Sequence, residues 1–215
     1  AWKHTIMTDH SQAMTAKYRQ DYRAPLYWID SIDLDFQLQE PLTRVTAISR
    51  LRRNGEHNEP LVLDGEGLVL HSVSVDGVPF TQFEQGESSL TLFNLPAECV
   101  LTIVTDLDPA ANTALEGLYK SGDAYCTQCE AEGFRRITYY LDRPDILARY
   151  STRITPDKAK YPYLLSNGNK VDSGELDGGR HFVQWQDPFP KPSYLFALVA
   201  GDFDVERGSY TTQSD

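Results

Sequence analysis

The feature that most constrains the fold is a series of short segments in which apolar and polar residues alternate. The clearest is residues 32–38, which place Ile, Leu, Phe and Leu at every second position with aspartate or glutamine between them. A period of two is typical of a half-buried strand. Residues 45–51 repeat the pattern less strictly after a short Glu40-Pro41 connection, which predicts an antiparallel pair. Asp76-Gly77 predicts a second, tight hairpin.

Similar patterns extend along the rest of the chain. Further strands are expected over residues 90–92, 100–104, 136–140, 150–154, 163–165, 181–185 and 194–199. A helix is expected only over residues 142–147, where Asp142 would cap the first turn and Pro144 would fit within it. We therefore predict an all-β fold of packed antiparallel β-sheets with little helix.

No internal repeat or low-complexity linker divides these strands, which favours one domain over residues 17–205. Residues 1–16 are expected to be a loose N-terminus, and residues 206–215 the start of a connection to a further domain. Met7 is a candidate native start, which would make residues 1–6 foreign to the protein.

Composition excludes some partners. The net charge of −11 disfavours nucleic acid and anionic membrane surfaces, because both attract basic patches. The longest apolar run, around residues 195–200, is too short to span a bilayer. The first sixteen residues lack the apolar core of a secretory signal, so a cytoplasmic location is expected.

The three cysteines include one C-x-x-C pair, Cys126 and Cys129, together with Cys99. A zinc ribbon needs a second such pair, and a thioredoxin-type pair opens a helix after a strand. Neither context is present around Cys129, so reduced, structural thiols are the favoured interpretation.

The stretch 112–145 departs from ordinary strand patterning, since glycines, aromatics and isolated carboxylates interrupt it. Such interruptions often mark functional sites. Gln128 and Glu130 stand two positions apart, so on an extended segment their side chains would point to the same side. A carboxylate supported by an amide oxygen suits a ligand with a free ammonium group.

This stretch, and blocks such as YPYLLSNGNK and WQDPFPKPSYLFALVAGDFDV, resemble the N-terminal domain of the bacterial aminopeptidase N family. These are zinc metallopeptidases of the gluzincin kind, of the alanyl aminopeptidase type, and the resemblance covers nearly the whole chain. It implies a saddle-like β domain that covers one side of a catalytic domain. It also implies that Glu130 binds the α-amino group of the substrate and that Gln128 lines the first side-chain pocket.

From residue type alone, Glu130 is instead a surface carboxylate or the partner of Arg135 or Arg136. Glu132 would lie on the same face as Glu130, where it would aid substrate placement or pair with a neighbouring arginine.

The zinc site of that family is absent from the sequence. An H-E-x-x-H helix supplies its first two ligands, and the histidines here do not have that spacing: His4, His10, His57, His71 and His181. We expect zinc and the catalytic residues to belong to a catalytic domain outside this chain, and the chain alone to be inactive. The expected partners are that domain and peptides with a free N-terminus. The alternative interpretation is a stand-alone β-sandwich that binds a protein or peptide.

Overall fold

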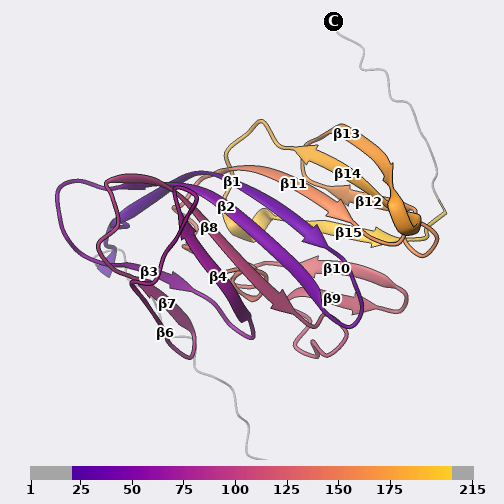
Figure 1. The fold of residues 1–215 in the computed structure, drawn as a ribbon, viewed down its shortest axis with the longest axis horizontal. Coiled ribbons are helices and arrows are strands. Elements are labelled where there is room, and N and C mark those ends of the chain that lie inside the picture. Colours follow the sequence, from indigo (N-terminus) through magenta and orange to yellow (C-terminus); the bar gives the residue numbers. More distant parts are fainter. Residues whose placement is uncertain (1–20, 205–215) are drawn as a thin grey trace, which may run out of the picture.

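The computed structural model describes residues 21–204. The predicted loose N-terminus over residues 1–16, the candidate start at Met7 and the connection over residues 206–215 lie outside the described residues. The described part forms fifteen strands and three short 3-10 helices (Figure 1). The strands are β1 (Tyr27–Gln37), β2 (Thr43–Arg53), β3 (Leu61–Asp64), β4 (Val69–Val75), β5 (Val78–Pro79), β6 (Phe83–Gln85), β7 (Ser89–Leu92), β8 (Glu98–Leu107), β9 (Gly117–Ser121), β10 (Ala124–Gln128), β11 (Arg149–Thr155), β12 (Tyr163–Ser166), β13 (Asn169–Leu176), β14 (Arg180–Gln186) and β15 (Leu198–Gly201). The 3-10 helices are η2 (Phe134–Arg136), η3 (Asp177–Gly179) and η4 (Ser193–Leu195).

The strands form three sheets. The large sheet has the order β13-β14-β11-β1-β2-β8-β4-β5, and the smaller sheets have the orders β12-β15-β10-β9 and β3-β7-β6. Within residues 21–204 neighbouring strands pair antiparallel, except that β1 and β11 pair in parallel. Figure 1 shows the large sheet running across the molecule, with β9 and β10 at one side of it and β3, β6 and β7 at its lower left. The predicted all-β class is confirmed.

The alternation in β1 and β2 places one face of the large sheet in the core. Ile32, Leu34 and Phe36 are buried, and Leu34 lies opposite Ala47 of β2. Ahead of them Tyr27 and Ile29 are also buried, although they occupy odd positions. A register shift between Ile29 and Ser31 explains the change, because one extra residue moves the following side chains to the opposite face.

Aromatic rings join the sheets beneath the stretch that the sequence singles out. Phe134 in η2 is fully buried, and its ring centroid lies 5.0 Å from that of Tyr140, 5.9 Å from that of Tyr150 in β11 and 5.4 Å from that of Phe196. Phe196 stacks in turn on Phe36 of β1 at 5.9 Å. This cluster connects η2 to both the large and the four-stranded sheet.

Three expectations for local structure are wrong. Residues 142–147 contain a turn at Pro144 and Asp145 in place of the expected helix, because the Asp142 carboxylate binds Arg135 and Ser193 and caps no helix. Residues 136–140 form the end of η2, a turn and a bend, and only Tyr140 makes an isolated β-bridge, with Asp64, in place of the expected strand. The strand expected over residues 194–199 begins only at Leu198, since Tyr194 and Leu195 belong to η4.

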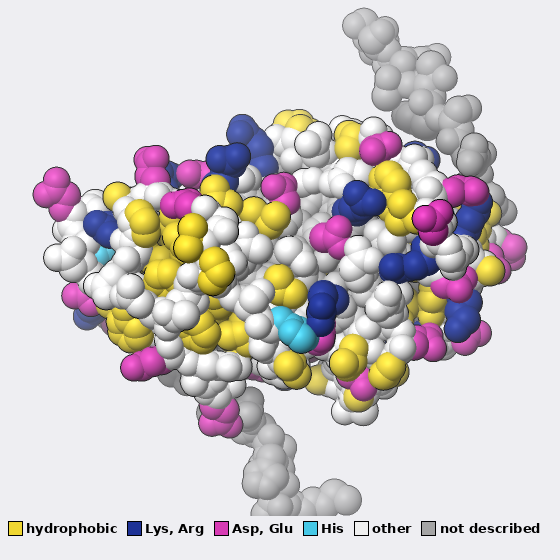
Figure 2. Space-filling view, viewed as in Figure 1, with side chains coloured by type: hydrophobic (Ala, Val, Ile, Leu, Met, Phe, Trp, Pro, Cys, Tyr) yellow, Lys and Arg dark blue, Asp and Glu magenta, His cyan; other side chains and the backbone are white. Residues whose placement is uncertain are grey.

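The surface carries charges of both signs. Figure 2 shows acidic and basic side chains interspersed over the face drawn, with apolar side chains gathered over the end that carries β3, β6 and β7. Exposed apolar residues with at least half of their surface accessible include Val62 of β3 and Val69 of β4. Within residues 21–204, no helix has the length and apolar character needed to cross a membrane.

Candidate functional site

Gln128 and Glu130 lie where β10 leaves the four-stranded sheet. β10 ends at Gln128, which pairs with Gly117 of β9, and Glu130 lies in the turn that follows. The predicted extended segment therefore stops between them. Both residues are exposed while Cys129 between them is 2% exposed, so the chain points Gln128 and Glu130 away from the core. The Gln128 side-chain oxygen accepts a long hydrogen bond of 3.4 Å from the backbone N–H of Glu130. The peptide bond between Glu130 and Ala131 is cis.

Two glycines allow this turn to pack closely against its neighbours. A Cβ on Gly133 would lie 2.2 Å from the carbonyl oxygen of Gln128 and 2.9 Å from the Cα of Cys129. Gly117 adopts a φ of +74°, and a Cβ there would lie 2.7 Å from the Cβ of Arg136. Any larger residue at Gly133 would push the turn away from β10. This close approach explains two of the glycines that interrupt the strand pattern.

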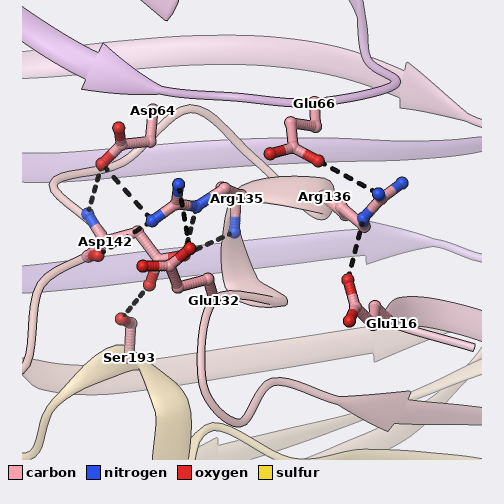
Figure 3. Close-up of polar contacts among 8 residues, drawn as sticks. All are labelled: Asp64, Glu66, Glu116, Glu132, Arg135, Arg136, Asp142 and Ser193. Atoms are coloured by element: carbon pink, nitrogen blue, oxygen red, sulfur yellow. Dashed lines mark hydrogen bonds and ion pairs between the residues drawn. The ribbon is translucent and has the colours of Figure 1, made fainter. Parts of the chain in front are cut away.

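Arg135 contacts three carboxylates (Figure 3). Its Nε lies 3.0 Å from an oxygen of Asp142, whose side chain is only 1% exposed. Longer ion pairs reach Glu132 at 3.6 Å and Asp64 at 3.9 Å. The pair between Glu132 and a neighbouring arginine, one of the two expected roles of Glu132, is therefore present.

Arg136 is paired independently of Arg135. It lies 3.0 Å from Glu66 in the connection between β3 and β4, and 3.3 Å from Glu116 just before β9 (Figure 3). Each arginine after the turn is thus matched by carboxylates other than Glu130. Among residues 21–204, the Glu130 carboxylate has no ion-pair partner, and the expected alternative in which it pairs with Arg135 or Arg136 is not observed.

The site thus consists of an outward-facing carboxylate and amide on a turn held by two arginines. Comparison with known proteins shows the family of the chain. The sequence matches the peptidase M1 N-terminal domain over residues 27–195. The chain belongs to this family. It is 61% identical over 204 residues to Aminopeptidase N of Escherichia coli (strain K12), covering 95% of this chain and 23% of that protein. It is 55% identical over 202 residues to Aminopeptidase N of Haemophilus influenzae, covering 93% of this chain and 23% of that protein. The chain spans about a quarter of the length of these curated relatives.

Solved structures agree with this assignment. Aminopeptidase A of Legionella pneumophila, solved in complex with aspartic acid, is 36% identical with a TM-score of 0.81, over 86% of this chain and 22% of that one. An M1 zinc metallopeptidase of Deinococcus radiodurans, solved with a Tyr-Ser-Ala substrate, has a TM-score of 0.70 at 18% identity, over 81% of this chain and 42% of that one. The second likeness concerns the fold alone. The family resemblance inferred from the sequence is confirmed.

This M1 N-terminal domain offers no evident place for a metal within the described residues. Residues 21–204 contain no group of three or more His, Cys, Asp or Glu side chains that could hold an ion. Burial raises the pKa of Cys129 to about 12, with a further contribution from the nearby Asp142 charge, and burial also raises the pKa of Cys126. A raised pKa disfavours the thiolate that a metal ligand or redox nucleophile requires. These shifts support structural roles for both thiols.

One polar cluster in this M1 domain was not predicted from the sequence. At the tip of the β9–β10 hairpin, Lys120 donates to Glu40 at 2.7 Å and to the Tyr161 hydroxyl at 3.0 Å. Burial alone would lower the pKa of Lys120, but its hydrogen bonds to Glu40 and Tyr161 outweigh burial and raise it. Beside it lies a pocket of about 420 Å³ lined by Glu40, Pro41, Pro109, Ala110, Lys120 and Tyr125. Lys120 and Glu40 are 80 positions apart, and no local pattern connects them.

Proposed function

We propose that this chain is the substrate-capping N-terminal domain of a zinc-dependent aminopeptidase that removes N-terminal amino acids from peptides. The observation that carries the proposal is the Glu130 carboxylate, which is exposed and has no ion-pair partner among residues 21–204 although two arginines follow within six residues. High identity to proteins named Aminopeptidase N supports it. A stand-alone binding module, the alternative, does not account for that identity.

The proposed role of Glu130 is to hold the α-amino group of the peptide. An ammonium group donates up to three hydrogen bonds, and a carboxylate accepts them as charge-assisted bonds. The side-chain oxygen of Gln128 lies 3.4 Å from the backbone nitrogen of Glu130 and would offer a second acceptor for the amino group. Holding the amino end at a set position would place the first peptide bond in register with the catalytic groups.

The chemistry itself is assigned to another part of the parent enzyme. Since residues 21–204 do not provide a zinc ligand set, we propose that zinc and the general base belong to a catalytic domain. That domain is the proposed partner, which this N-terminal domain covers. The purified chain is then expected to show no zinc-dependent hydrolysis of an alanine anilide, and such activity would overturn this assignment. We also propose a cytoplasmic location, which the unpaired thiols of Cys99, Cys126 and Cys129 support.

The test is Glu130→Ala in the full-length aminopeptidase. Loss of a hydrogen bond to a charged group costs about 1.5–3 kcal/mol, so kcat/KM for free-amine substrates should fall roughly ten- to a hundredfold. Zinc content should not change, because Glu130 is not proposed as a ligand. Glu132→Ala is the matched control from the same turn, and it should have a smaller effect since Arg135 already engages that carboxylate. Equal loss of zinc and activity in Glu130→Ala would refute the amine-anchor role.

A further inference from the structure

The turn that carries Glu130 is held from inside the protein by a single buried carboxylate. We infer that Asp142 is a positioning residue for amine recognition, acting through Arg135 on the Glu130 turn, defined here as residues 129–135. This inference rests on the proposed function of Glu130. It concerns a residue that does not touch the peptide.

Asp142 accepts hydrogen bonds with both of its carboxylate oxygens. Oδ2 accepts from the backbone N–H of Arg135 at 3.2 Å and from its Nε at 3.0 Å, while Oδ1 accepts from the Ser193 hydroxyl at 2.5 Å. The backbone carbonyl of Asp142 accepts from Nη2 of Arg135 at 3.2 Å. One residue thus binds both the main chain and the side chain of Arg135, which fixes the position and the orientation of that residue together.

The contacts of Asp142 also join segments that are far apart in the sequence. Its backbone N–H donates to Asp64 at the end of β3 at 3.3 Å, and Ser193 belongs to η4. Figure 3 shows these segments meeting around Asp142 and Arg135. Through Asp142, the position of Arg135 is therefore fixed relative to β3 and η4, which are distant in the sequence.

The Glu130 turn is held at both ends. At its start, Gln128 pairs with Gly117 in the four-stranded sheet. At its end, Arg135 is held by Asp142, and between them the backbone N–H of Gly133 donates to the carbonyl of Cys129 at 3.0 Å. Glu130 itself has no ion pair among residues 21–204 that would orient its carboxylate. Its place relative to the rest of the domain is therefore set by these two ends.

A buried ion pair of this kind is better explained by positioning than by stability. Desolvation offsets much of the attraction between buried charges, and apolar residues of similar volume often stabilise a fold equally well. A carboxylate that must satisfy Arg135 and Ser193 at once permits only one arrangement of the segments around it. Displacing a substrate-binding group by as little as about 1 Å can lower a rate roughly a hundredfold.

The test is a double-mutant cycle in the full-length aminopeptidase with Asp142→Asn, Glu130→Ala and the double variant. Asparagine keeps the volume of Asp142, but it replaces one accepting oxygen with a donor, so it cannot accept from both Arg135 and Ser193. The readouts are kcat/KM for an alanine anilide and the inhibition constants of alanine hydroxamate and propionohydroxamate, which differ only in the α-amino group. Asp106→Asn is the matched control, a mostly buried aspartate that pairs with Arg44 in the large sheet.

Asp142→Asn is expected to weaken the binding of alanine hydroxamate and to lower kcat/KM, each roughly ten- to a hundredfold. The binding of propionohydroxamate should not change. In the Glu130→Ala background the same substitution should have almost no further effect, because both act on one contact. Asp106→Asn should change neither inhibition constant.

The following results would overturn the inference and separate it from the proposed function. If Asp142→Asn weakens the binding of both inhibitors equally, Asp142 is only structural while Glu130 remains the anchor. The same holds if Asp142→Asn keeps its full effect in the Glu130→Ala background. If Glu130→Ala itself leaves alanine hydroxamate binding unchanged, the proposed function fails and the inference with it. Should Asp142→Asn not fold, Ser193→Ala takes its place, and the absence of a selective loss of alanine hydroxamate binding there would contradict the inference.

Discussion

At the scale of single residues, Asp106 shows how a charge pair makes the fold sensitive to pH. It lies in β8 and accepts from Arg44 of β2 at 3.0 and 3.1 Å, and its Oδ2 lies 2.6 Å from Nε2 of His71. The hydrogen bonds from Arg44, opposed by burial and assisted by His71, hold the pKa of Asp106 below its ordinary value. A carboxyl with a lower pKa in the folded than in the unfolded chain stabilises the fold above the unfolded pKa, and this stabilisation is lost as pH falls through the folded pKa.

Asp106→Asn is therefore expected to lower the Tm of the chain at pH 7 by roughly 2–4 °C. The difference from the unmodified chain should shrink below about pH 4, where the unfolded carboxyl is already protonated. Thermal unfolding measured by circular dichroism between pH 7 and pH 3 checks this. Asp30→Asn, which removes a similar but half-exposed pair with Arg52, should change the Tm little at any pH. A Tm difference for Asp106→Asn that stays constant down to pH 3 would contradict the assignment.

At the scale of elements, the packing of the Glu130 turn on β10 depends on the absence of a side chain at Gly133. In Gly133→Ala the new Cβ would meet the Gln128 carbonyl at 2.2 Å, and the contact is with backbone that cannot rotate away. We expect the free energy of unfolding to fall by about 1–3 kcal/mol, measured by urea denaturation. Gly86→Ala is the control, because its new Cβ first meets the Ser89 hydroxyl, which can rotate away. This substitution should lower the free energy of unfolding by less than about 0.5 kcal/mol. Equal costs for the two variants would show that the turn has room to move.

At the scale of the whole molecule, the buried aromatic cluster holds the sheets together as one core. Phe134 contacts Tyr150 of the large sheet and Phe196, which precedes β15 of the four-stranded sheet. Phe134→Ala should lower the free energy of unfolding by about 3–5 kcal/mol, since it leaves a cavity at the junction. Phe189→Ala, at a position 75% exposed, is the size-matched control and should stay within about 0.5 kcal/mol of the unmodified chain. Similar losses in both variants would mean that Phe134 does not join the sheets.

The features of this protein that the sequence predicted correctly depend on local patterns. The period of two in β1 and β2 and the Asp76-Gly77 turn predicted paired strands that the structure contains. The helix predicted over residues 142–147 is wrong, because residues suited to a helix cap and first turn form a turn there. Asp142 there binds Arg135, seven positions earlier, and Ser193, 51 positions later. Helix signals describe only the nearest four residues or so, and tertiary partners outweighed them.

The sequence by itself determined the all-β class, most of the strands and, through its motifs, the family and the candidate pair Gln128 and Glu130. These depend on side-chain periodicity and on residue identity, both of which are local. Only the tertiary structure decided that Arg135 and Arg136 pair with other carboxylates, so that Glu130 has no ion-pair partner in the described part of the chain. That outcome depends on β3, the approach to β9 and η4 meeting around one turn. Contacts between segments so far apart arise from the packing of the whole core, which no window along the chain contains.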